Sequence, residues 1–257
     1  METINITLAL LLTLLAGLST SLGSLIVYTI KQPLPNFLSA ILGFSAGVML
    51  YVSFLELLPQ GINIAGKNLA LISFFLGIAL IALIDFLVPA YKNPHEFKEA
   101  SEMKKSKKPT LLRTSILLAI TICIHNLPEG LATLFATLSN TRLGFAIAFA
   151  VALHNIPEGI SVSIPIYYAT KSRKKALLYS SLSGLTEPLG ALLGLAILLP
   201  FITEKLLAST FAFVAGIMVY ISLDELLPLA HKYGKEHTVI VGIIAGMLLM
   251  AASNIFF

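Results

Sequence analysis

Two near-identical stretches dominate this sequence: His125–Gly130 reads His-Asn-Leu-Pro-Glu-Gly, and His154–Gly159 reads His-Asn-Ile-Pro-Glu-Gly. Each lies inside a long apolar run. In both copies the histidine and the glutamate are four residues apart, so on a helix they share one face, about one turn apart. The two stretches therefore predict two apolar helices that each present an imidazole, an amide and a carboxylate on one side.

The proline before each glutamate adds a further donor. A proline has no N–H, so Pro128 leaves the carbonyl of Ile124 without its helical partner, and Pro157 does the same for Leu153. Imidazole nitrogen together with carboxylate, amide and carbonyl oxygen suits a divalent metal of intermediate softness, such as Zn²⁺ or Fe²⁺. The alternative is a satisfied polar group that packs two helices together. Ionisable groups in hydrocarbon cost roughly 3 kcal/mol each and usually serve a function, and the presence of two copies favours the metal site.

The composition is that of a membrane protein. Of the 257 residues, 57% are hydrophobic and 12% are charged, whereas a soluble domain carries about a quarter charged residues. The single cysteine, Cys123, cannot form an intramolecular disulfide. The net charge of +4 is better explained by membrane topology than by nucleic acid, so no nucleic-acid partner is expected. The predicted fold class is an all-α polytopic membrane protein.

Windows of about 20 apolar residues mark the membrane spans. We predict eight transmembrane helices, at Ile4–Ile30, Phe37–Leu58, Leu69–Tyr91, Leu111–Leu138, Leu143–Tyr167, Ala176–Leu199, Leu206–Ala230 and Val239–Phe257. The stretch Lys92–Thr110 is rich in Lys and Glu and is predicted to be a solvated loop. Residues 1–257 then form a single transmembrane domain, with helices 1–3 at 4–91, the loop at 92–110, helices 4–5 at 111–167 and helices 6–8 at 176–257.

Lysine and arginine predict the orientation, because they gather on the cytoplasmic side of membrane proteins. If the connections are assigned alternately to the two sides, one side receives only Lys67, Arg142 and Lys205. The other side receives fourteen: Lys31, Lys92, Lys98, Lys104, Lys105, Lys107, Lys108, Arg113, Lys171, Arg173, Lys174, Lys175, Lys232 and Lys235. We therefore expect a multi-pass protein of the cell membrane with both termini outside and the 92–110 loop in the cytoplasm.

The chain also repeats itself. Gly47–Pro59, GVMLYVSFLELLP, matches Gly216–Pro228, GIMVYISLDELLP, at eight of 13 positions, and the first predicted helix has a weaker echo in the sixth. Helices 1–3 would thus correspond to helices 6–8, five helices later, so the two units would point oppositely through the membrane. This 3+2+3 inverted repeat, with a polar, proline-containing site at its centre, is typical of transporters that work by alternating access.

Facing each other across the axis of the repeat, the two hexapeptides predict one shared site. Two carboxylates in one pocket repel each other unless a cation lies between them, and His125, Glu129, His154 and Glu158 make a four-ligand set suited to tetrahedral Zn²⁺. Asn126 and Asn155 could help to hold a second ion, with the glutamates bridging. Glu187, directly before Pro188 in the sixth predicted helix, is expected to join the site, although its echo in the first helix is Thr20.

Three further acids lie near the ends of predicted spans. Glu56 falls late in an outward-running helix, and Asp224 and Glu225 fall late in an inward-running one. Their placement suits the two ends of a cation path. Snorkelling of these side chains to the interface is the equally weighted alternative.

At these residues the chain resembles the ZIP family of divalent-metal transporters, in particular its prokaryotic ZupT/GufA-like branch. The resemblance covers the whole chain and rests on the paired HNxPEG motif in adjacent helices. It implies a 3+2+3 arrangement of helices, a binuclear metal site, movement of zinc and related metals into the cytoplasm, and a homodimer in the lipid bilayer. Carried over residue by residue, it assigns the metal-ligand role to His125, Asn126, Glu129, His154, Asn155, Glu158 and Glu187.

Three functions can be set against these features. The first is uptake of a divalent metal, Zn²⁺ above all, with Fe²⁺, Mn²⁺, Co²⁺ and Cd²⁺ left open; the metal is then the transported substrate, and no resident cofactor is expected. The second is an intramembrane metal-dependent hydrolase that activates water, but the His-Glu-x-x-His signature of such enzymes is missing from the sequence. The third is a metal sensor or a purely structural protein, which would not need acids at both ends of a path. Uptake explains most of these features, and no enzymatic activity is expected.

Overall fold

Apolar helices account for nearly all of the described chain. The computed structural model describes residues 6–29, 35–87, 108–201, 203–234, 236–253 and 255. Within these ranges the regular structure is entirely helical. In the part of the chain that the structure describes, six stretches are long and apolar enough to cross a bilayer, namely Ile6–Ile26, Asn36–Ala65, Lys67–Phe86, Thr141–Thr170, Arg173–Leu198 and Glu204–Lys232. The protein is thus a helical, multi-pass membrane protein, as predicted.

The elements follow one another in this order: α1 (Ile6–Thr29), α2 (Pro35–Tyr51), the π-helix η1 (Val52–Leu57), α3 (Leu58–Ala65), α4 (Lys67–Leu87), α6 (Lys108–Ser139), α7 (Thr141–Thr170), α8 (Arg173–Gly184), α9 (Thr186–Leu198), the short 3₁₀ turn η3 (Leu199–Phe201), α10 (Glu204–Ile221), the π-helix η4 (Ser222–Leu226), α11 (Leu227–Tyr233) and α12 (Glu236–Ser253).

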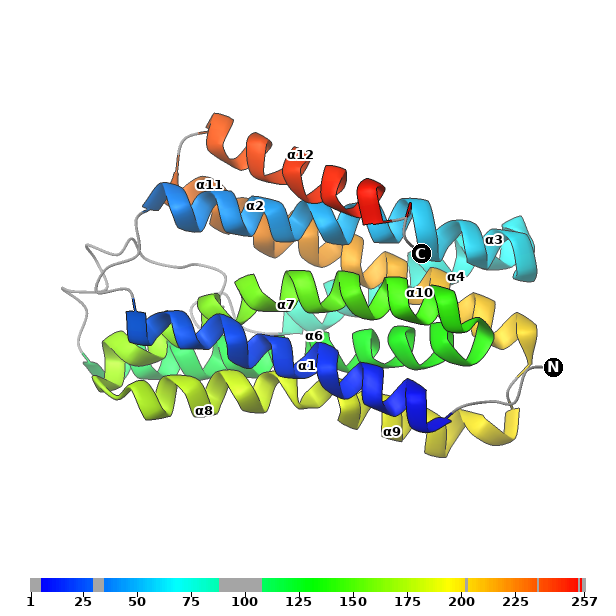
Figure 1. The fold of residues 1–257 in the computed structure, drawn as a ribbon, viewed down its shortest axis with the longest axis horizontal. Coiled ribbons are helices and arrows are strands. Elements are labelled where there is room, and N and C mark those ends of the chain that lie inside the picture. The colour runs from blue at the N-terminus through cyan, green and yellow to red at the C-terminus, as the bar shows by residue number, and fades with distance from the viewer. Residues whose placement is uncertain are drawn as a thin grey trace.

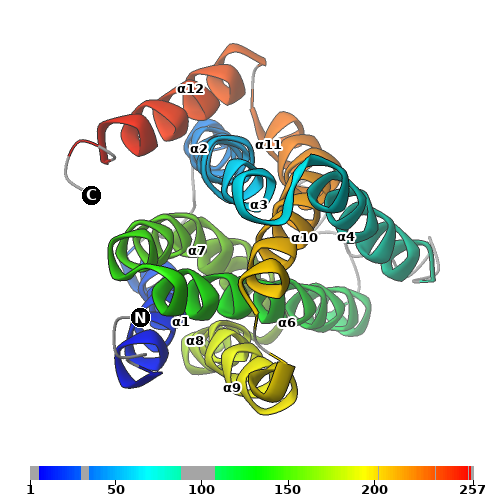
Figure 2. The same ribbon diagram turned by 90° about the vertical axis from the view of Figure 1, so that its right-hand side faces the viewer.

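The helices run roughly along one axis and gather into two groups (Figure 1). In the view along that axis, α1, α6, α7, α8 and α9 lie together, and α2, α4, α10, α11 and α12 form the other group (Figure 2). We call these the site bundle and the outer bundle. The main apolar core contains residues of both bundles, such as Phe135 of α6 and Phe211 of α10. The two bundles therefore share one core.

Two predicted spans continue beyond their expected ends, and both helical stretches pass through a proline, Pro59 or Pro228. The helix expected at Phe37–Leu58 continues to Ala65, and the one expected at Leu206–Ala230 reaches Tyr233. In both, a π-helical turn precedes the proline, and its last backbone bond joins residues five apart, Leu58 to Ser53 and Leu227 to Ser222. The wide turn accommodates the proline, which has no N–H to donate, so the helix continues.

The span expected at Ala176–Leu199 is instead two helices. α8 ends at Gly184 and α9 begins at Thr186, directly after Leu185. Pro188 cannot donate to the carbonyl of Gly184, which explains the interruption. The break was not predicted, although the proline that causes it is visible in the sequence.

The remaining boundaries differ by a few residues. The 92–110 loop was expected to reach Thr110, but α6 already begins at Lys108. Residues 92–107 lie outside the described residues, as do the last residues of the predicted spans that end at Tyr91 and Phe257.

Backbone contacts between helices occur in matched pairs. A Cβ atom added to Gly23 of α1 would collide with the carbonyl oxygen of Ile156 in α7, and one added to Gly190 of α9 would collide with that of Leu127 in α6. In the outer bundle, Gly47 of α2 meets the backbone of α12, and Gly216 of α10 meets that of α4. Such approaches require glycine, because any side chain would push the helices apart. Both pairs follow the correspondence between helices 1–3 and 6–8 that the sequence suggests.

Candidate metal site

The two hexapeptides lie in the middle of α6 and α7, which pack against each other. Each helix passes through its proline, Pro128 or Pro157, without ending. Asn140 caps the start of α7 by accepting hydrogen bonds from the backbone N–H groups of Arg142 and Leu143. The antiparallel pair thus brings two hexapeptides that differ at one position, Leu127 against Ile156, together from opposite directions.

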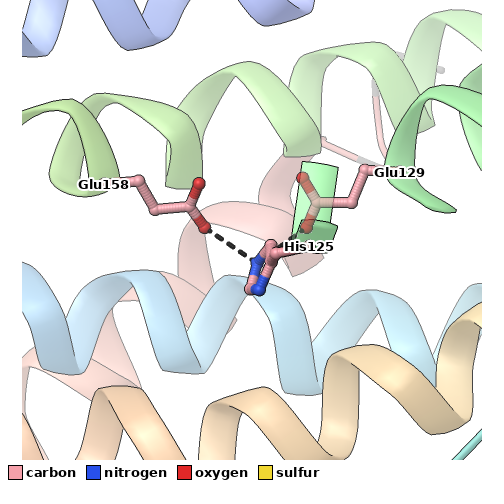
Figure 3. A group of neighbouring side chains, drawn as sticks. All are labelled: His125, Glu129 and Glu158. Carbon is pink, nitrogen blue, oxygen red and sulfur yellow. Dashed lines mark ion pairs between the residues drawn. The ribbon is translucent and has the colours of Figure 1, made fainter. Parts of the chain in front are cut away.

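Four of the predicted ligands form one cluster. The Nε2 atom of His125 lies 3.3 Å from Oε1 of Glu129 and 3.2 Å from Oε1 of Glu158. The Nε2 atom of His154 lies 3.1 Å from the same Glu129 oxygen. Figure 3 shows the carboxylates of Glu129 and Glu158 reaching the His125 ring from opposite sides. The sequence predicted this convergence across the two helices.

The cluster is buried, and some of its polar atoms have no hydrogen-bond partner among the described residues. All four side chains are at most 3% exposed. Among the described residues, Oε2 of Glu129 and Oε2 of Glu158 have no hydrogen-bond partner. Unpaired charge in a low-dielectric interior is expensive, so the pair of carboxylates calls for a cation between them. His125, Glu129 and Glu158 each offer one donor atom, and these atoms lie within 4.8 Å of one another, close enough to hold a single metal ion.

The two asparagines are oriented alike. The Nδ2 group of Asn126 donates to the carbonyl of Ser183 in α8 at 3.0 Å, and that of Asn155 donates to the carbonyl of Ala16 in α1 at 2.9 Å. In the described part of the chain, both Oδ1 atoms are buried and without a partner. Since the donor side of each amide is held by a neighbouring helix, the acceptor side is available to a cation.

Glu187 reaches the cluster from the first turn of α9. Its carboxylate is fully buried, and its Oε1 atom accepts a short hydrogen bond from Nδ2 of Asn155. Thr20 of α1, its counterpart in the repeat that the sequence suggests, is also fully buried. Gly130 meets the backbone of Glu187, and Gly159 meets that of Thr20. The two positions are thus equivalent in the fold, but only one of them carries a charge.

The three acids assigned to an access path lie apart from this group. Glu56 is part of η1, and Asp224 and Glu225 are part of η4. Glu56 lines an open cavity of about 450 Å³, together with Gln60, Ser139, Asn140, Arg142, Leu143 and Ala146. Between Ala146 and His154 on α7, the side chains of Ile147, Ala150 and Val151 are buried in the apolar core. Packed residues therefore separate this cavity from the cluster.

One contact to the cluster could not be predicted. The hydroxyl of Ser45 in α2 donates to the carbonyl of His154 at 3.3 Å, and so joins the outer bundle to the site bundle. Apolar periodicity shows that α2 is buried, but it does not show which helix lies against its serine. The only sequence signal was that a small polar residue occurs within an apolar run.

Comparison with known proteins identifies relatives along the whole chain. Residues 91–254 match the family model described as ZIP Zinc transporter. A protein named Zinc transporter ZupT from Chlorobium chlorochromatii is 53% identical over 98% of this chain and 98% of its own length. The protein of the same name from Streptococcus mutans is 53% identical over 97% of each chain, and that from Clostridium perfringens is 50% identical over 98% of this chain and 97% of its own.

Proposed function

This chain belongs to the ZIP zinc transporter family, and from that premise we propose that it carries divalent metal cations, zinc first among them, into the cytoplasm. The observation that carries the proposal is the cluster itself. Two carboxylates and two imidazoles from antiparallel helices meet in an apolar interior, where three nitrogen–oxygen pairs are 3.1 to 3.3 Å apart. This N₂O₂ donor set matches the preference of Zn²⁺ and of neighbouring transition metals.

The residues divide into two groups of ligands. His125, Glu129, His154 and Glu158 hold a first ion. Asn126, Asn155 and Glu187 hold a second ion beside it, with the carboxylates of Glu129 and Glu158 bridging the two. The free Oδ1 atoms of both asparagines and the free Oε2 atom of Glu187 support this assignment, as judged within the described chain. A second cation also offsets the additional buried charge of Glu187.

Transport requires that the site face each side of the membrane in turn. The matched glycine contacts support the eight-helix, 3+2+3 inverted repeat, and inverted repeats supply two related conformations of opposite direction. Glu56, beside the cavity, serves the path on one side, and Glu225 and Asp224 serve the other. The charge bias places Glu56 outside, together with both termini of a cell-membrane protein.

Transport is preferred to metal-dependent hydrolysis because the relatives are named transporters. The test is uptake of Zn²⁺ into proteoliposomes that contain the purified protein and a trapped fluorescent zinc indicator. We expect saturable uptake that protein-free liposomes do not show. A protein that binds zinc but gives no uptake above the protein-free background would contradict the proposal.

The orientation has its own test. A Ser101→Cys substitution in a Cys123→Ala background leaves one cysteine, in the 92–110 stretch. A membrane-impermeant maleimide should leave it unlabelled in intact cells and label it in opened ones. Labelling of intact cells would reverse the orientation without affecting the site.

The homodimer is proposed on the family resemblance alone. Mass measurement of the protein in detergent or nanodiscs would test it, with twice the 27.6 kDa of one chain as the expected protein mass. A particle with the mass of one chain would contradict it.

A further inference from the structure

The hydroxyl of Thr133 in α6 is one of three buried hydroxyls, with those of Thr20 and Ser39, that have no hydrogen-bond partner in the described part of the chain. Thr13, Ser53, Thr137 and Ser222 each donate to the carbonyl four residues earlier, at 2.7 to 2.8 Å. This is the usual way in which Ser and Thr are satisfied within an apolar helix. Thr133 is fully buried, yet its Oγ1 atom has no hydrogen-bond partner in the described part of the chain. Its side chain is therefore not held in the usual way.

Thr133 lies one helical turn beyond Glu129. Residues four apart share a face of the helix and are about 6 Å apart along its axis. Oε2 of Glu129 is likewise buried and without a partner among the described residues. Further along α6, six and seven residues beyond Thr133, Ser139 and Asn140 line the cavity beside Glu56. Thr133 thus lies on α6 between the metal cluster and this cavity.

The corresponding position on α7 carries no hydroxyl. Val162 of α7 lies one turn beyond Glu158, as Thr133 lies one turn beyond Glu129, and it is also fully buried. Because α6 and α7 are antiparallel, these two residues lie on opposite sides of the cluster. At the position one turn beyond the glutamate, a hydroxyl is therefore present on α6, on the side that leads to the cavity, and not on α7.

We propose that Thr133 Oγ1 is an additional oxygen ligand, which contacts the divalent cation on its way between the cavity and the carboxylate of Glu129. The inference rests on the proposed transport function and extends its ligand set by one residue. The hydroxyl has lone pairs for the cation, and it can donate its proton to the backbone carbonyl of Glu129, four residues earlier. The hydroxyl of Thr137 donates to the backbone carbonyl of Thr133 in the same way. The ligand is neutral and hard, so it favours Mn²⁺ over the softer Cd²⁺.

The test compares initial uptake rates of Mn²⁺ and Cd²⁺ into proteoliposomes for the wild type and three variants. Thr133→Val removes the hydroxyl and keeps the shape. It should raise the KM for Mn²⁺ roughly tenfold, the lower end of the loss expected when a supporting group leaves a metal site, and change the KM for Cd²⁺ less. Thr133→Ser should behave as the wild type. Thr137→Val is the matched control, because that hydroxyl only bonds its own helix.

A fourth variant keeps the inference testable if Thr133→Val does not fold. Thr133→Cys replaces the hard oxygen with sulfur and should lower the KM for Cd²⁺ relative to that for Mn²⁺. An unchanged ratio of the two KM values in Thr133→Val and Thr133→Cys would overturn the inference. Equal effects of Thr133→Val and Thr137→Val would also overturn it, since they would indicate a packing role. Absence of uptake by the wild type would instead contradict the proposed function itself.

Discussion

The α6 half and the α7 half of the metal site have the same framework but different neighbours. Each asparagine donates to a backbone carbonyl of an adjacent helix, Asn126 to Ser183 and Asn155 to Ala16. Each hexapeptide glycine touches the backbone of an adjacent helix. Asn155 then also donates to Glu187, whereas the position equivalent to Glu187 on the other side is the uncharged Thr20.

This comparison separates what the repeat provides from what single residues provide. The helix packing and the central charges are doubled, so both halves should be equally necessary for folding and for holding the first ion. Glu187 occurs once, so a second ion should depend on one side only. The predictions below test this division, beginning with the largest effect.

The largest effect is expected from loss of either central carboxylate. Glu129→Ala or Glu158→Ala leaves too little negative charge to neutralise a divalent ion in a low-dielectric site. Each variant should abolish zinc transport and lose zinc binding by calorimetry, and the two should be equally damaging. Glu204→Ala, at an exposed acid at the start of α10, is the control and should transport normally. Zinc transport by Glu129→Ala at the wild-type rate would contradict the assignment of Glu129 as a ligand of the transported ion.

The packing of the two halves can be compared by enlarging their glycines. Gly130→Ala would place a Cβ against the carbonyl oxygen of Glu187, and Gly159→Ala would place one against that of Thr20. Backbone cannot move aside cheaply, so each should destabilise the protein by at least ~1–3 kcal/mol. Thermal unfolding in detergent measures this, with Ser139→Ala as an exposed control. If only one glycine proves sensitive, the two helix crossings are not equivalent.

The second ion should follow Glu187. Glu187→Ala should lower the number of bound zinc ions from two to one and leave measurable transport, because the four central ligands remain. Thr20→Ala removes the equivalent side chain of the other half and should leave two ions bound. Calorimetric stoichiometry on both purified variants decides. If the Glu187→Ala variant still binds two zinc ions, Glu187 is not needed to hold the second ion.

The smallest effect is expected from the imidazoles. His125→Ala or His154→Ala retains both carboxylates, so binding should weaken without being lost. Imidazole favours Zn²⁺ over Mn²⁺, so affinity for Zn²⁺ should fall more than affinity for Mn²⁺. Competition titrations of the two metals on each variant measure the change. An equal loss for both metals would indicate that the histidines only shape the pocket.

Much of the site could be predicted because its chemistry repeats in the sequence. The spacing of His125 and Glu129, and of His154 and Glu158, places each pair on one helix face, and the tandem copies imply that they meet. Apolar windows located the spans for the same reason, since a bilayer requires about 20 apolar residues. Local spacing and composition were sufficient for these features.

Other features depend on contacts between helices and were missed. The π-turns before Pro59 and Pro228 let two helices continue past these prolines and beyond the ends expected at Leu58 and Ala230. The interruption at Leu185 depends on one missing backbone donor. Ser45 bonds the backbone of His154 only because α2 lies against α7. Such contacts are set by three-dimensional packing, which residue spacing along one helix does not describe.

The central claim is that the cluster in α6 and α7 holds the transported ion, with a second ion beside Glu187. Crystals of the protein grown with Zn²⁺ and measured at the zinc absorption edge test it most directly. We predict two anomalous peaks, one among His125, Glu129, His154 and Glu158, and one beside Asn155 and Glu187. Zinc peaks confined to other parts of the molecule, with none among these four side chains, would contradict the account.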